Sequence, residues 1–181
     1  PILGGGWHPL LVAAPANGRY QAFGNLFAAV NDEGYRPHRH PAMSRHPVTP
    51  MQEADLRVHL ARQTERRIGL VDYLALKSGR GDERLAAERG RGAEIVSVDV
   101  VDDDTLAAAG ALIWQNRGER LFAPASQGLE HALVAHWRKE RLIASEPAAT
   151  RAQAAKHLVA VSGSCSPATA EQIRHAEKNG F

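Results

Sequence analysis

Short apolar segments alternate with helix-like patterns from residue 68 onward, and this alternation restricts the fold more than any other feature. We predict strands over residues 68–76, 94–100, 121–125 and 158–161. Helices are predicted over residues 79–92, 105–116 and 129–141, and from Pro167 onward. Strands that alternate with helices favour an α/β fold with an open, mostly parallel sheet flanked by helices. Ligands of such sheets bind where strands end and helices begin, so the intervening turns are candidate sites.

The first third of the chain contains extended segments and a proline-rich stretch. Residues 10–14 form a short apolar run that predicts a buried strand, and residues 19–29 are predicted to be extended with a bend at Gly24 and Asn25. Residues 31–50 are polar and contain four prolines, which excludes a long helix there. A non-regular segment of that length in a compact domain is usually functional or disordered.

A helix is predicted to begin at Thr49. Thr49 is a favourable N-cap, Pro50 suits the first helical position, and Gln52 stands at the third position of a capping box. Leu56 and Leu60 then lie four residues apart, on one face of the helix. We expect that face to pack against the core.

Composition places the chain among ordinary globular proteins. It has 181 residues, of which 44% are hydrophobic and 23% charged, and this predicts one domain or a little more. The net charge is +2 with acids and bases interleaved, which gives nucleic-acid binding little support. No apolar run reaches the roughly 20 residues that span a bilayer, and no signal peptide is recognised. The single cysteine, Cys165, excludes an internal disulfide and fits a cytoplasmic protein.

Two polar clusters invite a metal-binding interpretation. The three acids of residues 102–104 precede a predicted helix, and we interpret them as groups that cap its N-terminus. His38, His40 and His46 lie within nine residues, but no cysteine or suitably spaced acid accompanies them. Arginines alternate with these histidines, so the segment is either a cationic loop for a small anion or a solvated loop. We predict no metal site.

The turn at residues 162–166 joins the last predicted strand to the helix that Pro167 opens. Its backbone N–H groups, its serine hydroxyls and the positive end of the helix dipole suit a phosphate or a carboxylate. The same composition is common in plain connections, and neither a P-loop nor a GxGxxG pattern is present. Ser164 and Cys165 lack the partner residues that would indicate a nucleophile.

Three segments together resemble the four-carbon acid sugar kinase family, some of whose members carry the label Hrp-dependent type III effector. The segments are RYQAFGNLFA (19–28), HPAMSRHPVTPMQEADLRVHLARQT (40–64) and VSGSCSPATAEQI (161–173). The resemblance implies a kinase that uses ATP and Mg to phosphorylate a hydroxyl of a four-carbon sugar acid. It also implies a two-domain protein that is considerably longer than this chain.

The resemblance divides the chain into three parts. Residues 1–141 correspond to the later part of the sugar-acid-binding domain, residues 142–156 to a linker, and residues 157–181 to the truncated start of the nucleotide-binding domain. The family's N-terminal acidic motif has no counterpart here. The catalytic residues are therefore unknown, and we expect this chain alone to be inactive.

The resemblance also assigns binding residues. In the loop at residues 43–50, Arg45 is the candidate partner of the substrate carboxylate, and His46 and Thr49 are its neighbours. The candidates for the nucleotide phosphates are Gly163, Ser164 and Ser166.

Ser126 is a further substrate-binding candidate. The turn at residues 125–130 matches a family segment usually written GSSGLE. Ala125 and Gln127 stand where glycine and serine are usual. These departures indicate either weaker ligand binding or a different substrate preference at this turn.

Two functions are therefore carried forward. The first is a fragment of an ATP-dependent sugar-acid kinase. The alternative is a non-catalytic small-acid-binding or effector-type interaction protein, which the departures at Ala125 and Gln127 favour. The expected partners are a small sugar acid and ATP. Self-association is allowed, whereas nucleic acids and membranes are not expected partners.

Overall fold

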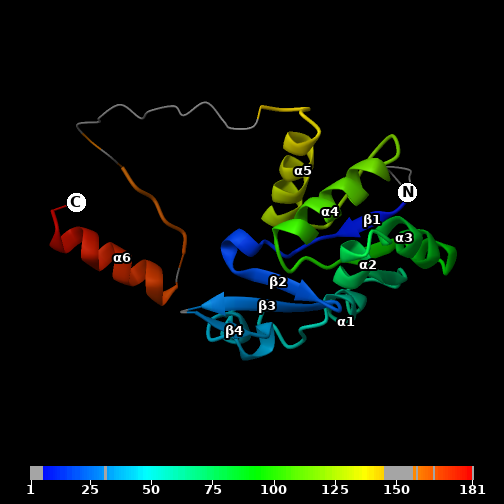
Figure 1. Cartoon of the computed structure of the whole chain (residues 1–181). Coiled ribbons are helices and arrows are strands. Elements are labelled where there is room, and N and C mark those ends of the chain that lie inside the picture. Colours follow the sequence, from blue (N-terminus) through cyan, green and yellow to red (C-terminus); the bar gives the residue numbers. More distant parts are fainter. Residues whose placement is uncertain (1–5, 31, 145–156, 158, 165, 181) are drawn as a thin grey trace. The chain divides into compact units, whose positions relative to one another are not determined.

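Figure 1 presents the computed structural model of the chain. The structure describes residues 6–30, 32–144, 157, 159–164 and 166–180. The chain divides into two compact units, Pro1–Ser145 and Glu146–Phe181. Most of the predicted linker, residues 142–156, lies outside the described residues. Within the described ranges, none of the helices has the length and apolar character needed to cross a membrane.

A parallel sheet forms the centre of the first unit. β6 (Ile95–Val98) runs between β1 (His8–Leu10) and β5 (Ile68–Val71), and both neighbours are parallel to it. All four residues of β6 are buried, as expected for a central strand that is covered on both faces. Beyond β1, Leu11 forms one further parallel bridge with Ala125. The predicted α/β class with a parallel sheet flanked by helices is confirmed.

Helices cover one face of this sheet, as Figure 1 shows: α2 (Tyr73–Lys77), α3 (Gly81–Gly90), α4 (Asp103–Gln115) and α5 (Gln127–Lys139). Their apolar side chains and those of the strands form the larger of two buried clusters. α4 packs tightly against α5 at Gly110, where an added Cβ atom would lie 2.0 Å from the carbonyl oxygen of Ala132. Only glycine allows this contact between the two helices.

The opposite face of the parallel sheet is covered by an antiparallel sheet and a short helix. β2 (Arg19–Ala22), β3 (Asn25–Val30) and β4 (Glu33–Tyr35) form the antiparallel sheet, and α1 (Leu56–Ala61) lies beside it. The predicted bend at Gly24 is the loop of the β2–β3 hairpin. Short 3-10 turns occur at η1 (Pro15–Asn17), η2 (Pro37–Arg39) and η3 (Met43–Arg45).

Successive side chains of β6 point alternately toward the helices on one face and toward the antiparallel sheet on the other. Val96 and Val98 belong to the larger cluster, under the helices, whereas Ile95 belongs to the smaller cluster beside α1 and β3. Because successive residues of a strand point to opposite faces, Ser97 points the same way as Ile95. Asp99 follows in the same series, so its side chain lies toward the antiparallel sheet.

The helix predicted to begin at Thr49 begins instead at Leu56, so that prediction is wrong. Asp55 is the N-cap of α1 and has extended backbone angles. The residues before it pair with the antiparallel sheet, because the N–H of Leu26 donates to the carbonyl of Ala54 at 2.8 Å. The residues at Thr49 satisfy local capping rules, but this tertiary pairing keeps the chain extended until Asp55.

The strand predicted over residues 68–76 is too long. β5 ends at Val71, and Asp72 then accepts a hydrogen bond from the N–H of Ala75 at 2.9 Å as the N-cap of α2. The apolar residues after Asp72 therefore belong to a helix. A short apolar run does not distinguish a strand from a buried helix, and here the capping aspartate decides between them.

Two other strand predictions in the first unit also fail. Residues 121–125 contain only the bridge of Ala125 to Leu11, because the chain turns into α5 directly afterwards. The strand predicted over residues 10–14 lies earlier, at His8–Leu10. The strand predicted over residues 94–100 and the helices predicted over 79–92, 105–116 and 129–141 are confirmed, with shifts at their ends.

The second unit contains α6 (Pro167–Lys178), which Pro167 opens as predicted. The strand predicted over residues 158–161 is wrong, because residues 159–161 lie outside any strand. Val159 and Val161 are 86% and 93% exposed. A strand needs a neighbour to satisfy its backbone groups, and the described part of this unit contains no strand that could pair with it.

Candidate functional site

A buried carboxylate marks the edge at which the parallel strands end. Asp99 follows β6 directly and is fully buried. Its Oδ2 atom accepts hydrogen bonds from the N–H of Phe23 at 2.5 Å and the N–H of Tyr73 at 3.3 Å. Its Oδ1 atom accepts from the N–H of Gly24 at 3.0 Å and from the side-chain amide of Gln21 at 2.9 Å. One carboxylate thus joins the tip of the β2–β3 hairpin to the start of α2.

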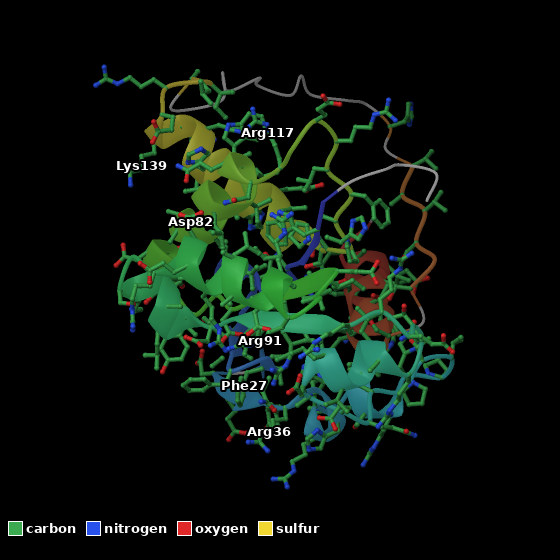
Figure 2. The ribbon with its side chains drawn as sticks, turned by 90° about the vertical axis from the view of Figure 1, so that its right-hand side faces the viewer. Phe27, Arg36, Asp82, Arg91, Arg117 and Lys139 are labelled. Atoms are coloured by element: carbon green, nitrogen blue, oxygen red, sulfur yellow. The ribbon has the colours of Figure 1, made fainter. Side chains whose placement is uncertain are left out.

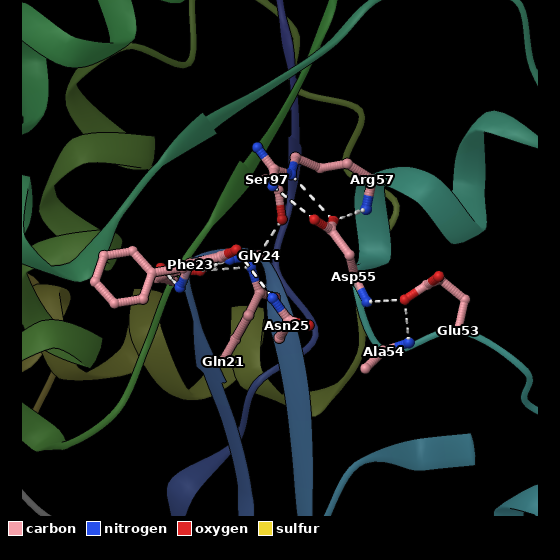
Figure 3. Close-up of polar contacts among 10 residues, drawn as sticks. Gln21, Phe23, Gly24, Asn25, Glu53, Ala54, Asp55, Arg57 and Ser97 are labelled. Carbon is pink, nitrogen blue, oxygen red and sulfur yellow. Dashed lines mark hydrogen bonds and ion pairs between the residues drawn. The ribbon is translucent and has the colours of Figure 1, made fainter.

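Burial raises the pKa of the Asp99 carboxyl above its ordinary value, because the charged form loses its hydration. The four hydrogen bonds to the carboxylate act in the opposite direction, but burial has the larger effect. Gln21 also donates to the hydroxyl of Ser97 at 2.8 Å, and Figure 3 shows these residues beside the hairpin tip. A buried titratable group at the edge where α/β sheets bind ligands is a candidate for a functional site.

An ion pair flanks the hairpin tip. The guanidinium of Arg57 donates to the Asp55 carboxylate at 2.6 and 3.0 Å, and Figure 3 shows this pair next to Gly24. A Cβ atom on Gly24 would lie 2.8 Å from the Nε atom of Arg57. Gly24 also has a φ of +81°, so glycine is favoured here for both reasons.

Ser126 lies at the same edge, beside the end of β1. Its N–H donates to the carbonyl of Leu11 at 3.2 Å, and its hydroxyl donates to the carbonyl of Val12 at 2.8 Å. Ser126 precedes α5 but its side chain does not cap that helix. The hydroxyl therefore anchors the turn to the sheet, and the first backbone N–H groups of α5 are left without a side-chain cap.

A hollow of about 380 Å³ opens between the end of α2 and the start of α4. It is lined by Leu76, Lys77, Asp104 and Thr105. The ammonium of Lys77 pairs with Asp102 at 2.6 Å. The bonds from Lys77 and Thr105 lower the pKa of the Asp102 carboxyl to about 2. Asp102, one of the acids predicted to cap α4, forms a capping box with Thr105.

The structure places the predicted carboxylate-binding loop on the surface. Arg45, His46 and Thr49 are all exposed. His46 and Thr49 meet, since the Nδ1 atom of His46 accepts from the Thr49 N–H at 3.0 Å and lies 3.0 Å from its hydroxyl. Hydrogen bonds and ion pairs within the described residues do not engage the guanidinium of Arg45, nor do they link this loop to Ser126.

The histidines before this loop have structural surroundings. His40 is buried, and its Nδ1 atom accepts hydrogen bonds from the N–H groups of Ala42 and Met43 at 3.1 and 3.2 Å. The guanidinium of Arg36, the residue before η2, lies 5.9 Å from the ring centre of Phe27 in β3, and Figure 2 shows these two side chains near each other. In the ranges that the structure describes, no three His, Cys, Asp or Glu side chains are grouped to hold a metal ion.

Mild acidification should loosen the turn that His40 holds. Burial, and next the positive charge of Arg19, lower the pKa of His40 below its ordinary value of 6.5. The folded state therefore binds protons less readily than the unfolded state. The stabilisation that neutral His40 gives to the folded state is complete above pH 6.5. It is lost as the pH falls from 6.5 through the lowered pKa of His40. Hydrogen exchange of the Ala42 and Met43 amides, followed by NMR, should become faster over this range.

The control is His40→Asn, which keeps a side-chain acceptor that does not titrate in this range. Its Ala42 and Met43 amides should show no added acid sensitivity beyond that of neighbouring amides. Equal acid responses in the variant and the wild type would contradict the role assigned to His40.

The predicted nucleotide turn bonds mainly within itself. Ser166 caps α6, because its hydroxyl accepts from the N–H of Thr169 at 3.1 Å. The hydroxyl of Ser164 accepts from the Ser166 N–H at 3.3 Å and from the Thr169 hydroxyl at 2.9 Å. A Cβ atom on Gly163 would meet open space. Cys165 lies outside the described residues, and a nucleotide-binding role of this turn stays a prediction.

The family model for a sugar-binding N-terminal domain matches residues 3–133. The chain belongs to this family. The match covers the parallel sheet, the antiparallel sheet and the first half of α5, and therefore the whole carboxyl edge described above. The expected relationship with the four-carbon acid sugar kinases is confirmed by this match and by the curated relatives of the chain.

Curated relatives of this sugar-binding domain are kinases by name. A 3-oxo-isoapionate kinase from Paraburkholderia graminis is 52% identical over 177 residues, which cover 98% of this chain and 38% of that protein. A 3-oxo-tetronate kinase from Methylobacterium radiotolerans is 32% identical over 171 residues, which cover 91% of this chain and 38% of that protein. The chain thus spans little more than a third of the length of these relatives.

Solved structures share the fold of this sugar-binding domain. A Haemophilus influenzae protein of the DUF1537 family has a TM-score of 0.64 at 24% identity, covering 95% of this chain and 39% of that one. A Bordetella bronchiseptica protein, with bound citrate and as a domain-swapped dimer, has a TM-score of 0.53 at 23% identity, covering 74% and 30%. Likeness at these identities shows the fold alone.

The sequence alone did not reveal that four residues meet at the carboxyl edge of this sugar-binding domain: Asp99, Gln21, Phe23 and Tyr73. One signal was available, since Asp99 stands at the end of a β-branched run and is the first charged residue after the strand. Its partners in the hairpin lie about 76 residues earlier in the chain. No spacing rule connects positions so distant.

Proposed function

We propose that this chain binds a small sugar acid, and that the protein containing it phosphorylates a hydroxyl of that acid with ATP. The observation that carries the proposal is the 52% identity, over 98% of this chain, to a kinase of 3-oxo-isoapionate. The second kinase acts by name on 3-oxo-tetronate, also a small oxidised sugar acid. The matched family model, with its sugar-binding domain, supports the acid-binding half of the proposal.

The acid would be held where the parallel strands end. The N-terminus of α5 offers backbone N–H groups that Ser126 does not cap, and such a helix end favours a carboxylate. Arg45 offers an exposed guanidinium, whose fork matches carboxylate geometry, with His46 and Thr49 beside it. These groups are the proposed carboxylate partners.

The described residues do not fit a magnesium site, because they contain no cluster of acids or histidines able to hold the ion. Gly163, Ser164 and Ser166 remain the proposed phosphate-side residues, through the backbone N–H groups that precede α6. We assign no phosphoryl-transfer step to the residues of this chain. The base and the magnesium ligands would come from other parts of the parent protein.

The test is a coupled ADP-release assay on the full-length protein with 3-oxo-isoapionate, D-erythronate, L-threonate and the 3-oxo forms of the last two. We expect ATP-dependent phosphorylation of at least one acid, with the product identified by mass spectrometry. A folded full-length protein that phosphorylates none of them, and binds none by calorimetry, would refute the proposal. Cytoplasmic location is expected of an enzyme that uses ATP.

Arg45→Ala in the full-length protein should raise the KM for the acid about tenfold or more, with the KM for ATP nearly unchanged. The reason is the loss of a charged bond to the carboxylate. Arg39→Ala is the matched control, since Arg39 is an exposed arginine six residues earlier in the same stretch. If Arg45→Ala leaves the acid KM unchanged, Arg45 does not belong to the site.

The alternative function is acid binding without phosphorylation. The observation that favours it is the turn before α5, which departs from the usual family segment. Gln127 begins the helix there, and the Ser126 hydroxyl donates to the carbonyl of Val12. In the assay above, this function predicts calorimetric binding without ADP release. Association of two copies is also proposed, and light scattering of the purified protein tests it directly.

A further inference from the structure

The tip of the β2–β3 hairpin holds a phenylalanine in an unfavourable position. Phe23 and Gly24 both have positive φ, +50° and +81°, which is the signature of a type I′ turn. Asparagine or glycine is the favoured first residue of such a turn, because a bulky side chain is strained there. The Phe23 residue is also 50% exposed, so it does not gain the usual benefit of burial.

The buried carboxylate fixes this phenylalanine against a tyrosine. The Oδ2 atom of Asp99 accepts from the backbone N–H groups of both Phe23 and Tyr73. The two rings meet edge to face, with centres 5.1 Å apart and planes at 63°. Leu74 beside them is 50% exposed. The result is a small, rigid aromatic surface at the carboxyl ends of β5 and β6, where sheets of this class bind ligands.

An ion pair lies next to this aromatic surface. Lys77 follows Tyr73 by four residues in α2, so both side chains lie on one face of that helix. The Lys77 ammonium pairs with Asp102 at 2.6 Å and is half-exposed. Because Asp102 neutralises this ammonium, the rings supply the binding chemistry of this face, as a surface for C–H groups.

We propose that Phe23 and Tyr73 form a contact surface for the carbon chain of the sugar acid, whose carboxylate is held by the groups named above. The inference rests on the proposed function and names residues that decide its specificity. The two rings match the short C–H face of a small sugar acid. Asp99 is a positioning residue, because it holds the backbone of both aromatic residues.

The test compares Phe23→Asn with Phe122→Asn in the full-length protein. Asparagine suits a type I′ turn and keeps the N–H that Asp99 accepts, so Phe23→Asn should fold at least as stably as the wild type. Phe122 is a matched control, since it is 54% exposed and contacts His8 at the opposite end of β1. The probes, measured by calorimetry, are D-erythronate, L-threonate and any acid that the ADP-release assay identifies as a substrate.

We expect Phe23→Asn to weaken binding of the acid about tenfold and Phe122→Asn to leave it unchanged. Tyr73→Leu, which keeps apolar bulk but removes the ring, should give a similar loss. Saturation-transfer NMR gives a readout that a structural role would not change. Irradiation of aromatic protons should reach the C–H protons of the acid in the wild type and more weakly in Phe23→Asn.

Equal affinities of the wild type and Phe23→Asn, with acid binding intact, would overturn the aromatic contact and leave the proposed function standing. Saturation transfer that is unchanged in Phe23→Asn would overturn it in the same way. If the wild type binds none of the probes and phosphorylates no acid, the proposed function fails and the contact surface fails with it.

Discussion

Gly128→Ala should destabilise the first unit by about 3 kcal/mol, because the new methyl group has no space. A Cβ atom at position 128 would lie 1.7 Å from the carbonyl oxygen of Ala13 and 2.8 Å from the Cδ2 atom of Leu11. Ala13 and Leu11 are fully buried. Relief of the clash therefore requires α5 to move away from the end of β1.

Urea unfolding followed by circular dichroism measures this loss. Gly90→Ala is the matched control, since Gly90 is the last residue of α3 and a Cβ atom there meets nothing within 4 Å. The control should leave the free energy of unfolding unchanged or raise it by up to about 1 kcal/mol. Similar effects of the two substitutions would mean that α5 does not pack against Ala13 as described.

Asp99→Ala should lower the free energy of unfolding by about 3 kcal/mol and release the tip of the β2–β3 hairpin. The substitution removes an acceptor that serves the N–H groups of Phe23, Gly24 and Tyr73 and the amide of Gln21. Buried donors left without an acceptor cost about 1–3 kcal/mol each, and the partly exposed ones recover water. Urea unfolding gives the stability, and hydrogen exchange of the Gly24 amide shows whether the tip has opened.

Asp99→Asn separates the charge of this residue from its shape. The Asp99 pKa is raised in the folded protein, so the folded state binds the proton more readily than the unfolded state. Wild-type stability should therefore fall as the pH rises from 3.8 through the raised pKa, and the asparagine variant should lack this slope. The stability advantage of the wild type should shrink as the pH rises. A stability difference between the wild type and Asp99→Asn that does not change with pH would contradict the burial of this carboxylate.

Elements with strong local signals were predictable from the sequence. β6 follows from a β-branched run, and α4 follows from its apolar face and the capping acid Asp102. The hairpin bend was indicated by Gly24, which the turn requires at positive φ. Each of these signals lies within a few residues of the element that it specifies.

The misplaced start of α1 results from competition by a distant part of the chain. Thr49 satisfies the rules for an N-cap, but the pairing of Leu26 with Ala54 keeps the chain extended to Asp55. The hydroxyl of Ser126 likewise makes a tertiary hydrogen bond, to the carbonyl of Val12, and its role in substrate binding stays a prediction. Local propensity is a weak preference that a tertiary hydrogen bond overrides.

The sequence by itself determined the α/β class and the family, because periodicity and short motifs are local properties of the chain. Only the tertiary structure decided which residues meet at the carboxyl edge. Asp99 touches Phe23 across 76 positions and Tyr73 across 26, and these contacts exist only because β6 lies beside β5 and beneath the hairpin. The physical reason is that a buried carboxylate takes its hydrogen bonds from whichever donors packing brings within 3 Å or so, not from neighbours in sequence.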